Sequence, residues 1–328
     1  MENLNLQIQN SGRTEIPQKI IDQLIAKKYF KLFVPEVLNG LELSLSHAIP
    51  FLIETAKINP SLGWLHNLGA GANYFCGFFE EEVATSIFSN KKIVTSGSGS
   101  PSGDFLEKKN GFEISGKWGK CSGASFATHL TCVATNLDNK NEEKTFILPA
   151  HDIEVINDWS NFGLKASASY SYELKNFLVD KKLEFEINKV KSFSYYSIYN
   201  VPFDLFARVC LSASLEGIVL KFVDDVNSEV RNPSPTLLNI IENLKQTLIK
   251  LNNKRFEIAR EIDHAYSKGL SKDTNPPVVI ELAVLHKSCY DLVVQAYFNA
   301  GLRITEEESP LNWTFRDVLT AVQHYMLK

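Results

Sequence analysis

The chain has 328 residues, of which 44% are hydrophobic and 22% are charged, and its 34 basic and 38 acidic side chains leave a net charge of -4. This length is sufficient for two or three domains with a large core, and the composition is typical of a globular protein. A slightly acidic balance without a basic block argues against nucleic-acid binding.

The cysteines and the N-terminal sequence indicate a reducing compartment. Cys76, Cys121, Cys132, Cys210 and Cys289 are scattered and form no C-x-x-C pair, so neither a disulfide framework nor a zinc site is predicted. The N-terminal stretch is polar, and no run approaches the roughly 18 apolar residues of a membrane span. We therefore expect a cytoplasmic protein that binds no metal and does not enter a membrane.

Residues 1–91 are predicted to form a helical domain. Apolar side chains recur at helical spacing over residues 17–30 and 43–58, and Pro17 stands where helices often begin. Ser61 is expected to cap a third helix that contains Trp64, and the helical pattern continues over residues 75–88.

Residues 92–190 change to a period of two, which is typical of strands. No helical pattern separates the candidate strands, so an antiparallel barrel or sandwich is predicted rather than a parallel sheet. The glycine-rich segment 96–104, SGSGSPSGD, has neither G-K-[ST] nor a G-x-G-x-x-G that opens a helix, and a flexible linker is the alternative to a ligand contact. The candidate strands are residues 93–96, 111–118, 129–135, 144–148, 153–156 and 171–179.

The stretch 111–129, GFEISGKWGKCSGASFATH, combines a strand with a cluster of small residues. Trp118 is followed by Ser122, Gly123 and Ala124, so backbone can approach a flat ligand closely while an indole covers it. The alternative is an ordinary strand end with Trp118 in the core.

Residues 191–328 are predicted to form a helical bundle with helices over residues 205–226, 237–266 and 277–300 and a last helix near Trp313. Gly217 is expected to break the first of these. In the last helix, Arg316, Thr320 and His324 are spaced to share one face. A lone histidine on a helix is more often solvated or packed than functional.

Three separated patterns resemble the acyl-CoA dehydrogenase superfamily, in particular its branch of two-component flavin-dependent monooxygenases of the hydroxyphenylacetate and dibenzothiophene types. They are LFVPE at 32–36 with SLGW at 61–64, the GF-x-I-SGKW-x-x-C-SG-A stretch from 111, and PLNWTFRDVLTAVQH at 310–324. The resemblance implies an α+β multidomain fold with an N-terminal helical domain (1–91), a middle antiparallel β-barrel (92–190) and a C-terminal four-helix bundle (191–328).

The same resemblance implies a flavin-dependent monooxygenase that uses reduced FAD or FMN and oxygen on a small organic substrate. A separate flavin reductase would supply the cofactor, and the chain would form a homodimer or homotetramer. Ser122 would bond the flavin near N5, Trp118 would flank its ring, and His324 would act as a base or stabilise a flavin hydroperoxide. The implied cofactor-binding residues are Ser96, Ser98, Trp118, Ser122 and Arg316, and the implied catalytic residues are Ser122 and His324.

Two alternatives stay open. An acyl-CoA dehydrogenase needs a carboxylate to abstract the α-proton of the thioester, and the family's two positions for it fall at Tyr325 and near Ala207, neither of which is acidic. A dehydrogenase would therefore require another base. The other alternative is a flavin-free homo-oligomer that keeps only the fold.

Overall fold

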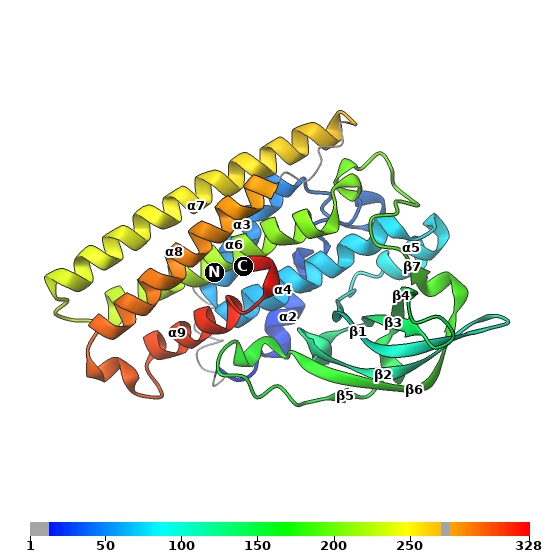
Figure 1. Cartoon of the computed structure of the whole chain (residues 1–328), viewed down its shortest axis with the longest axis horizontal. Helices are drawn as coiled ribbons and strands as arrows, with labels where there is room; N and C mark the ends of the chain where they lie inside the picture. The colour runs from blue at the N-terminus through cyan, green and yellow to red at the C-terminus, as the bar shows by residue number, and fades with distance from the viewer. Residues whose placement is uncertain (1–12, 270–275) are drawn as a thin grey trace.

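The computed structural model describes residues 13–269 and 276–328 (Figure 1). Within these residues, helices come first, strands follow and helices return, as the sequence predicts. The helices are α2 (Gln18–Ala26), α3 (Leu45–Ile58), α4 (Pro60–Asn73), α5 (Glu81–Phe88), α6 (Phe203–Glu229), α7 (Pro235–Ser267), α8 (Pro276–Asn299) and α9 (Pro310–Ala321). The strands are β1 (Thr95–Lys108), β2 (Gly111–Cys121), β3 (His129–Asn136), β4 (Glu143–Pro149), β5 (Val155–Ile156), β6 (Tyr170–Asp180) and β7 (Glu184–Phe185).

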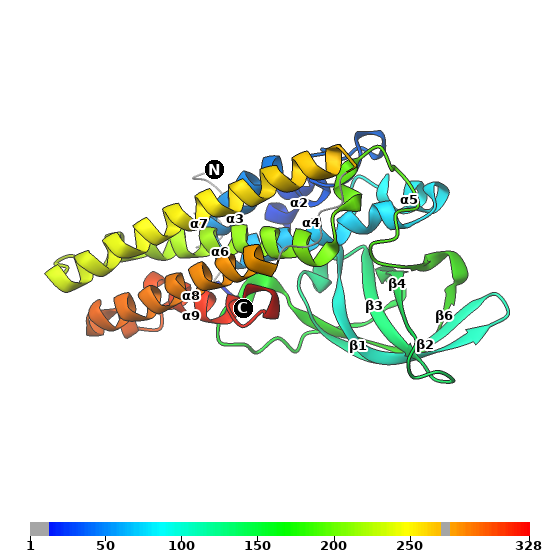
Figure 2. The ribbon, with the colours of Figure 1, turned by 45° about the horizontal axis from the view of Figure 1, so that its top comes forward.

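The strands form one seven-stranded sheet in the order β5-β6-β2-β1-β3-β4-β7. Neighbouring strands are antiparallel except β1 and β3, which run parallel. The predicted purely antiparallel barrel is therefore wrong in this respect, because an alternating pattern marks a strand but carries no information about its direction. Figure 2 shows the sheet lying beside the helical part of the molecule.

The glycine-rich segment is part of β1, so the alternative of a flexible linker is wrong. Its pairing with β3 is irregular at Gly97, Pro101 and Gly103. A Cβ at Gly97 would lie 2.0 Å from the Thr131 hydroxyl oxygen, so only glycine lets β1 approach β3 this closely.

The first and last helical parts of the chain share one hydrophobic core. This core extends from Leu32 to Leu327 and includes side chains of α3, α4, α6 and α7, whereas the sheet has a separate cluster around Phe105 and Trp118. The predicted boundaries at residues 91 and 190 thus coincide with changes of element type, and the division into three domains stays a prediction. No helix among the described residues has the length and apolar character required to cross a bilayer.

Gly217 does not break a helix, contrary to the sequence-based expectation. Helix α6 is continuous through it, and a Cβ there would lie 2.4 Å from the Ile53 carbonyl oxygen of α3. The glycine therefore permits a close crossing of two helices, which outweighs its low helix propensity of about 1 kcal/mol.

Helix α4 begins two residues earlier than the Ser61 cap would place it. Asn59 is the N-cap, because its side-chain oxygen accepts a hydrogen bond from the Leu62 N–H at 2.9 Å. Pro60 occupies the first helical position, where its missing N–H costs nothing. Asparagine and proline together thus supply the start signal that the sequence interpretation assigned to Ser61.

Two glycines of α4 are predicted to respond oppositely to alanine. Gly63→Ala would place a Cβ 2.2 Å from the Ala56 Cα of α3, whereas Gly71→Ala meets nothing within 4 Å. Overpacking is expected to lower the free energy of unfolding of Gly63→Ala by about 1–3 kcal/mol, while helix propensity raises that of Gly71→Ala by up to about 1 kcal/mol. Urea unfolding followed by circular dichroism tests this, and equal effects of the two substitutions would contradict the close α3–α4 packing.

Candidate active site

Ser122 lies directly after β2 and belongs to a cluster of buried serines. Its hydroxyl lies 2.8 Å from that of Ser169, which lies 2.7 Å from that of Ser167. The Ser167 hydroxyl donates to the Leu164 carbonyl at 2.7 Å, and the Ser96 hydroxyl of β1 donates to the Ser122 carbonyl at 2.8 Å. All four serines are buried. The structure thus brings together two predicted cofactor-binding residues, Ser96 and Ser122, with two serines that the sequence interpretation did not select.

Trp118 is fully buried within the sheet. Its indole N–H donates to the Val133 carbonyl at 2.8 Å, and its ring stacks on Tyr172 with centroids 5.5 Å apart. The ring edge also covers Gly103 and Gly116, where a Cβ would lie within 3 Å of it. Trp118 thus lies in the core of the sheet, which was the alternative stated from the sequence. This placement gives no support to Trp118 as a cover for a planar ligand.

His324 lies beyond the end of α9, in an extended residue that caps a short 3₁₀ turn. The predicted continuous face of Arg316, Thr320 and His324 is therefore wrong, because the helix ends at Ala321 before the face is complete. The imidazole is half-buried, contacts the Trp64 indole edge-on at 5.8 Å and stacks on Tyr325 at 5.1 Å. Burial, and secondarily the Arg208 cation, lower the pKa of His324 below its ordinary value, so the neutral ring predominates at neutral pH.

The two remaining predicted residues lie apart from the serine cluster's hydrogen bonds. Arg316 donates to the Asn312 side chain at 3.1 Å and lies over the Phe162 ring at 5.4 Å. The Ser98 hydroxyl of β1 is half-buried and accepts a long 3.3 Å hydrogen bond from the Ser100 N–H. Their roles in cofactor binding stay predictions.

Helix α4 connects the serine cluster to His324. Trp64 contacts the His324 ring, and the next residue, Leu65, lies 3.4 Å from where a Cβ on Gly123 would be. Ser122 precedes Gly123, so one turn of α4 adjoins both candidate catalytic residues. The SLGW pattern at residues 61–64 was the signal in the sequence for this helix.

Asp317 is a functional candidate that was not among the site residues predicted from the sequence. Its buried carboxylate accepts the Leu164 N–H at 2.5 Å and thereby holds the loop that carries Ser167 and Ser169 against α9. A Cβ on Gly163 would lie 2.1 Å from the Arg316 carbonyl oxygen, so glycine is required for this contact. Burial raises the pKa of Asp317 to about 7, against the lowering effect of the Leu164 N–H.

We expect this raised pKa to appear in the stability of the protein. An aspartate in the unfolded chain has a pKa of about 3.9, whereas buried Asp317 stays protonated until about pH 7. The folded state then holds the extra proton between these values, so the free energy of unfolding falls as the pH rises through this window, by about 1.4 kcal/mol per pH unit at most. Asp317→Asn, which keeps an acceptor for Leu164, is expected to remove this fall and to exceed the wild type in stability at pH 8. Parallel stability profiles of the two proteins from pH 4 to 8 would contradict the assignment.

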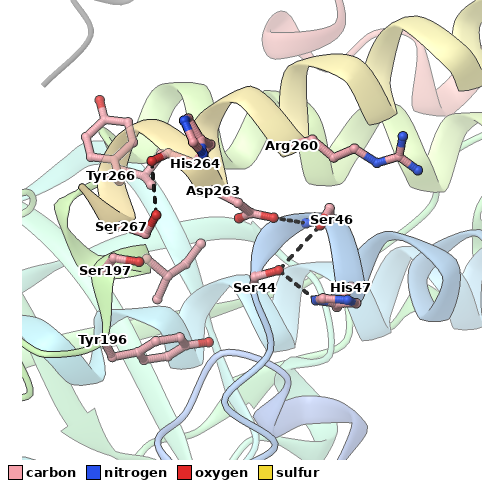
Figure 3. A pocket seen from close by; sticks show the side chains of 12 residues that line it. Ser44, Ser46, His47, Tyr196, Ser197, Arg260, Asp263, His264, Tyr266 and Ser267 are labelled. Atoms are coloured by element: carbon pink, nitrogen blue, oxygen red, sulfur yellow. Dashed lines mark hydrogen bonds between the residues drawn. The ribbon is translucent and has the colours of Figure 1, made fainter. Parts of the chain in front are cut away.

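Two cavities among the described residues are lined by none of the predicted site residues. The larger, of about 420 Å³, lies between the start of α3 and the end of α7 (Figure 3). Its polar groups pair with one another: Asp263 accepts the Leu45 and Ser46 N–H groups at 2.9 and 3.0 Å, and the Ser44 hydroxyl lies 2.9 Å from His47 Nδ1. The smaller, of about 50 Å³, adjoins Asp317 and Trp313.

The serine cluster fits the polar edge of a flavin. Within the described residues, no donor reaches the Ser122 hydroxyl oxygen apart from its contact with Ser169, so a lone pair stays available to a ligand. The adjacent Gly123 has φ of +80° and presents no side chain, and Leu65 of α4 packs against it. Ser122 thus offers a hydrogen-bond acceptor to a ligand, beside a residue that has no side chain.

The curated proteins that match the chain are named as hydroxylases or a monooxygenase. No family model matches the chain. The oxygenase component of p-hydroxyphenylacetate 3-hydroxylase from Acinetobacter baumannii is 23% identical over 92% of this chain and 77% of its own length. Indole-3-acetate monooxygenase from the same species is 24% identical over 52% of this chain and 44% of its own length.

Solved structures share the fold over the whole chain. The HsaA monooxygenase from M. tuberculosis superposes with a TM-score of 0.90 at 14% identity, covering 100% of this chain and 92% of that one. XiaF from Streptomyces sp., solved with FADH2 and glycerol, gives 0.86 at 15% identity over 100% and 92%. FMN-bound TdsC from Paenibacillus sp. A11-2 gives 0.82 at 15% identity over 99% and 91%. The resemblance to flavin-dependent monooxygenase oxygenase components with an acyl-CoA dehydrogenase-like fold is therefore confirmed.

Proposed function

We propose that this chain is the oxygenase component of a two-component flavin-dependent monooxygenase that inserts oxygen into a small aromatic substrate. The observation that carries the proposal is that a hydroxylase oxygenase component and a solved monooxygenase match the chain over most of its length, while α4 contacts His324 and Gly123, the residue after Ser122. Reduced FMN or FAD, when bound, would supply the electrons that activate molecular oxygen.

In this proposal the chain's own residues bind the flavin and orient it. Ser122 contacts the flavin near N5, Ser96 holds the Ser122 backbone in place, and Ser98 and Arg316 contribute to cofactor binding. The serines around Ser122 are buried, and hydrogen bonds are stronger in such surroundings than in water.

His324 is better suited to donate a hydrogen bond than to act as a base. Its Nδ1 accepts the Met326 N–H at 3.4 Å, so the neutral ring carries its proton on Nε2. An Nε2–H group can stabilise a developing negative charge on oxygen, whereas proton abstraction would require the bond at Nδ1 to break. Of the two roles implied by the resemblance, the geometry supports the donor.

The proposal includes a separate flavin reductase, a cytoplasmic location and a homodimer or homotetramer. The relative from Acinetobacter baumannii is named an oxygenase component, which supports a second component that delivers reduced flavin. Exposed apolar side chains one turn apart on α8, Ile280 and Val284, each 59% exposed, support self-association.

A single-turnover experiment tests this function. The protein, photoreduced FMN or FAD and a panel of small phenols and indoles are mixed with ¹⁸O₂, and products are analysed by mass spectrometry. We expect one ¹⁸O atom in a hydroxylated product. Reduction of a dye by an acyl-CoA without oxygen, and no labelled product, would instead establish a dehydrogenase.

A further inference from the structure

The buried serines at the end of β2 form a hydrogen-bonded chain whose direction can be deduced. A carbonyl oxygen has no proton, so the 2.7 Å contact between Ser167 and the Leu164 carbonyl requires the Ser167 proton to lie between them. Each hydroxyl has one proton, so Ser167 cannot also donate to Ser169. The 2.7 Å contact between these two serines therefore requires Ser169 to donate.

The same count applies to the next link. Because the Ser169 proton is directed at Ser167, the 2.8 Å contact between Ser169 and Ser122 requires Ser122 to donate. The reverse direction would leave the Ser167 hydroxyl and the Leu164 carbonyl as two facing acceptors 2.7 Å apart. Ser122 thus has its only proton turned toward the protein, and it can offer a ligand nothing but lone pairs.

This direction matters for flavin, whose N5 changes character with oxidation state. In oxidised flavin N5 has no hydrogen and only accepts a hydrogen bond, whereas in reduced flavin N5 carries a hydrogen and donates one. An acceptor-only Ser122 matches the reduced form and leaves the oxidised form with two unsatisfied acceptors in contact. A buried mismatch of this kind weakens the binding of oxidised flavin.

We propose that Ser167 and Ser169 are positioning residues that fix the direction of the Ser122 proton and so make the site select reduced over oxidised flavin. The inference rests on the proposed function, because it takes Ser122 to contact N5. It gives Ser167 and Ser169, which were not among the predicted site residues, a role in distinguishing reduced from oxidised flavin.

The loop that carries these serines is held firmly enough to keep the distances fixed. The Gly123 and Ala124 N–H groups donate to the Ser167 and Ala168 carbonyls at 2.9 and 3.2 Å. Leu164 and Ala168 adopt left-handed conformations, with φ of +51° and +47°, and such conformations persist only where surrounding contacts impose them. The proton chain is therefore preorganised before any ligand arrives.

Equilibrium binding measures the preference directly. Dissociation constants for oxidised and anaerobically photoreduced FMN are determined for the wild type and for Ser169→Ala, Ser169→Thr, Ser167→Ala and Ser192→Ala. In Ser169→Ala the Ser122 proton loses its acceptor and becomes free to donate to oxidised N5. We expect the ratio of the oxidised to the reduced dissociation constant to fall about tenfold, the equivalent of one hydrogen bond.

The other variants make the result specific. Ser169→Thr keeps a hydroxyl and is expected to restore the wild-type ratio. Ser167→Ala frees the Ser169 proton and is expected to shift the ratio in the same direction as Ser169→Ala, which also tests the inference if Ser169→Ala fails to fold. Ser192 is a matched buried serine, whose hydroxyl donates to the Cys76 carbonyl, and its replacement is expected to leave the ratio unchanged.

The outcomes separate this inference from the function on which it rests. Flavin binding by the wild type, with a ratio that neither Ser169→Ala nor Ser167→Ala changes, would overturn the inference alone. Failure of the wild type to bind either FMN or FAD in either state would overturn the proposed function as well.

Discussion

Replacing His324 with alanine is expected to lower the rate of product formation by about 10²–10³-fold, the usual contribution of one preorganised hydrogen-bond donor. The half-buried imidazole presents its Nε2–H from beside Trp64, and alanine removes that donor without removing the serine cluster. Affinity for reduced flavin is expected to change far less than the rate. Stopped-flow single turnovers with reduced flavin and oxygen measure the rate, and oxygen that is released as hydrogen peroxide gives the uncoupled fraction.

His264 supplies the control for this prediction. It is an exposed histidine near the end of α7, and it lines the cavity at the start of α3. His264→Ala is expected to leave both coupling and rate near wild-type values. Equal losses in the two variants, or full coupling in His324→Ala, would remove His324 from the proposed machinery.

Removing one partner of the buried ion pair in the helical bundle is expected to cause the largest loss of stability. Arg255 of α7 and Glu216 of α6 are 2.5 Å apart, with their side chains 0% and 5% exposed. Glu216→Gln leaves the guanidinium buried without its counter-charge, and about 3–5 kcal/mol of unfolding free energy should be lost. Urea unfolding at pH 7 followed by circular dichroism measures it.

An exposed ion pair provides the comparison. Lys57 and Asp224 are 3.2 Å apart, with about half of each side chain exposed, so solvent screens their attraction. Asp224→Asn is expected to cost less than about 1 kcal/mol. A double variant, Glu216→Gln with Arg255→Met, should recover most of the loss, since no charge then stays buried. A Glu216→Gln variant as stable as the wild type would show that the pair is not buried in solution.

Hydrophobic periodicity was sufficient to predict the elements but not how they approach one another. The helices in residues 205–300 and the strands predicted at 111–118, 129–135, 144–148 and 171–179 were found close to their predicted positions, because each has a clear periodic pattern. The predicted strand 93–96 covers only the start of β1, which continues through the glycine-rich segment to Lys108. The expectation for Gly217 was wrong because the sequence alone does not distinguish a glycine that breaks a helix from one that allows another helix to pack closely. The β1–β3 pairing was missed because strand direction depends on the path of the connection between strands.

The candidate site was predictable where residues match a pattern and unpredictable where tertiary contacts decide. Ser122 and Ser96 lie together because they end and begin neighbouring strands, whereas Ser167 and Ser169 reach them through a loop held by Asp317, 153 positions away from Leu164. Trp118 suits either a ligand or a core, and its Val133 and Tyr172 contacts place it in the core. His324 left the expected helical face because α9 ends three residues before it.

A crystal structure of the protein with anaerobically reduced FMN or FAD would test most directly whether Ser122 and His324 enclose the cofactor. The account predicts that the isoalloxazine lies against the residues after β2, with N5 within hydrogen-bonding distance of the Ser122 hydroxyl and the His324 ring on the opposite side. A flavin bound elsewhere on the chain, with Ser122 and His324 both out of contact, would contradict it.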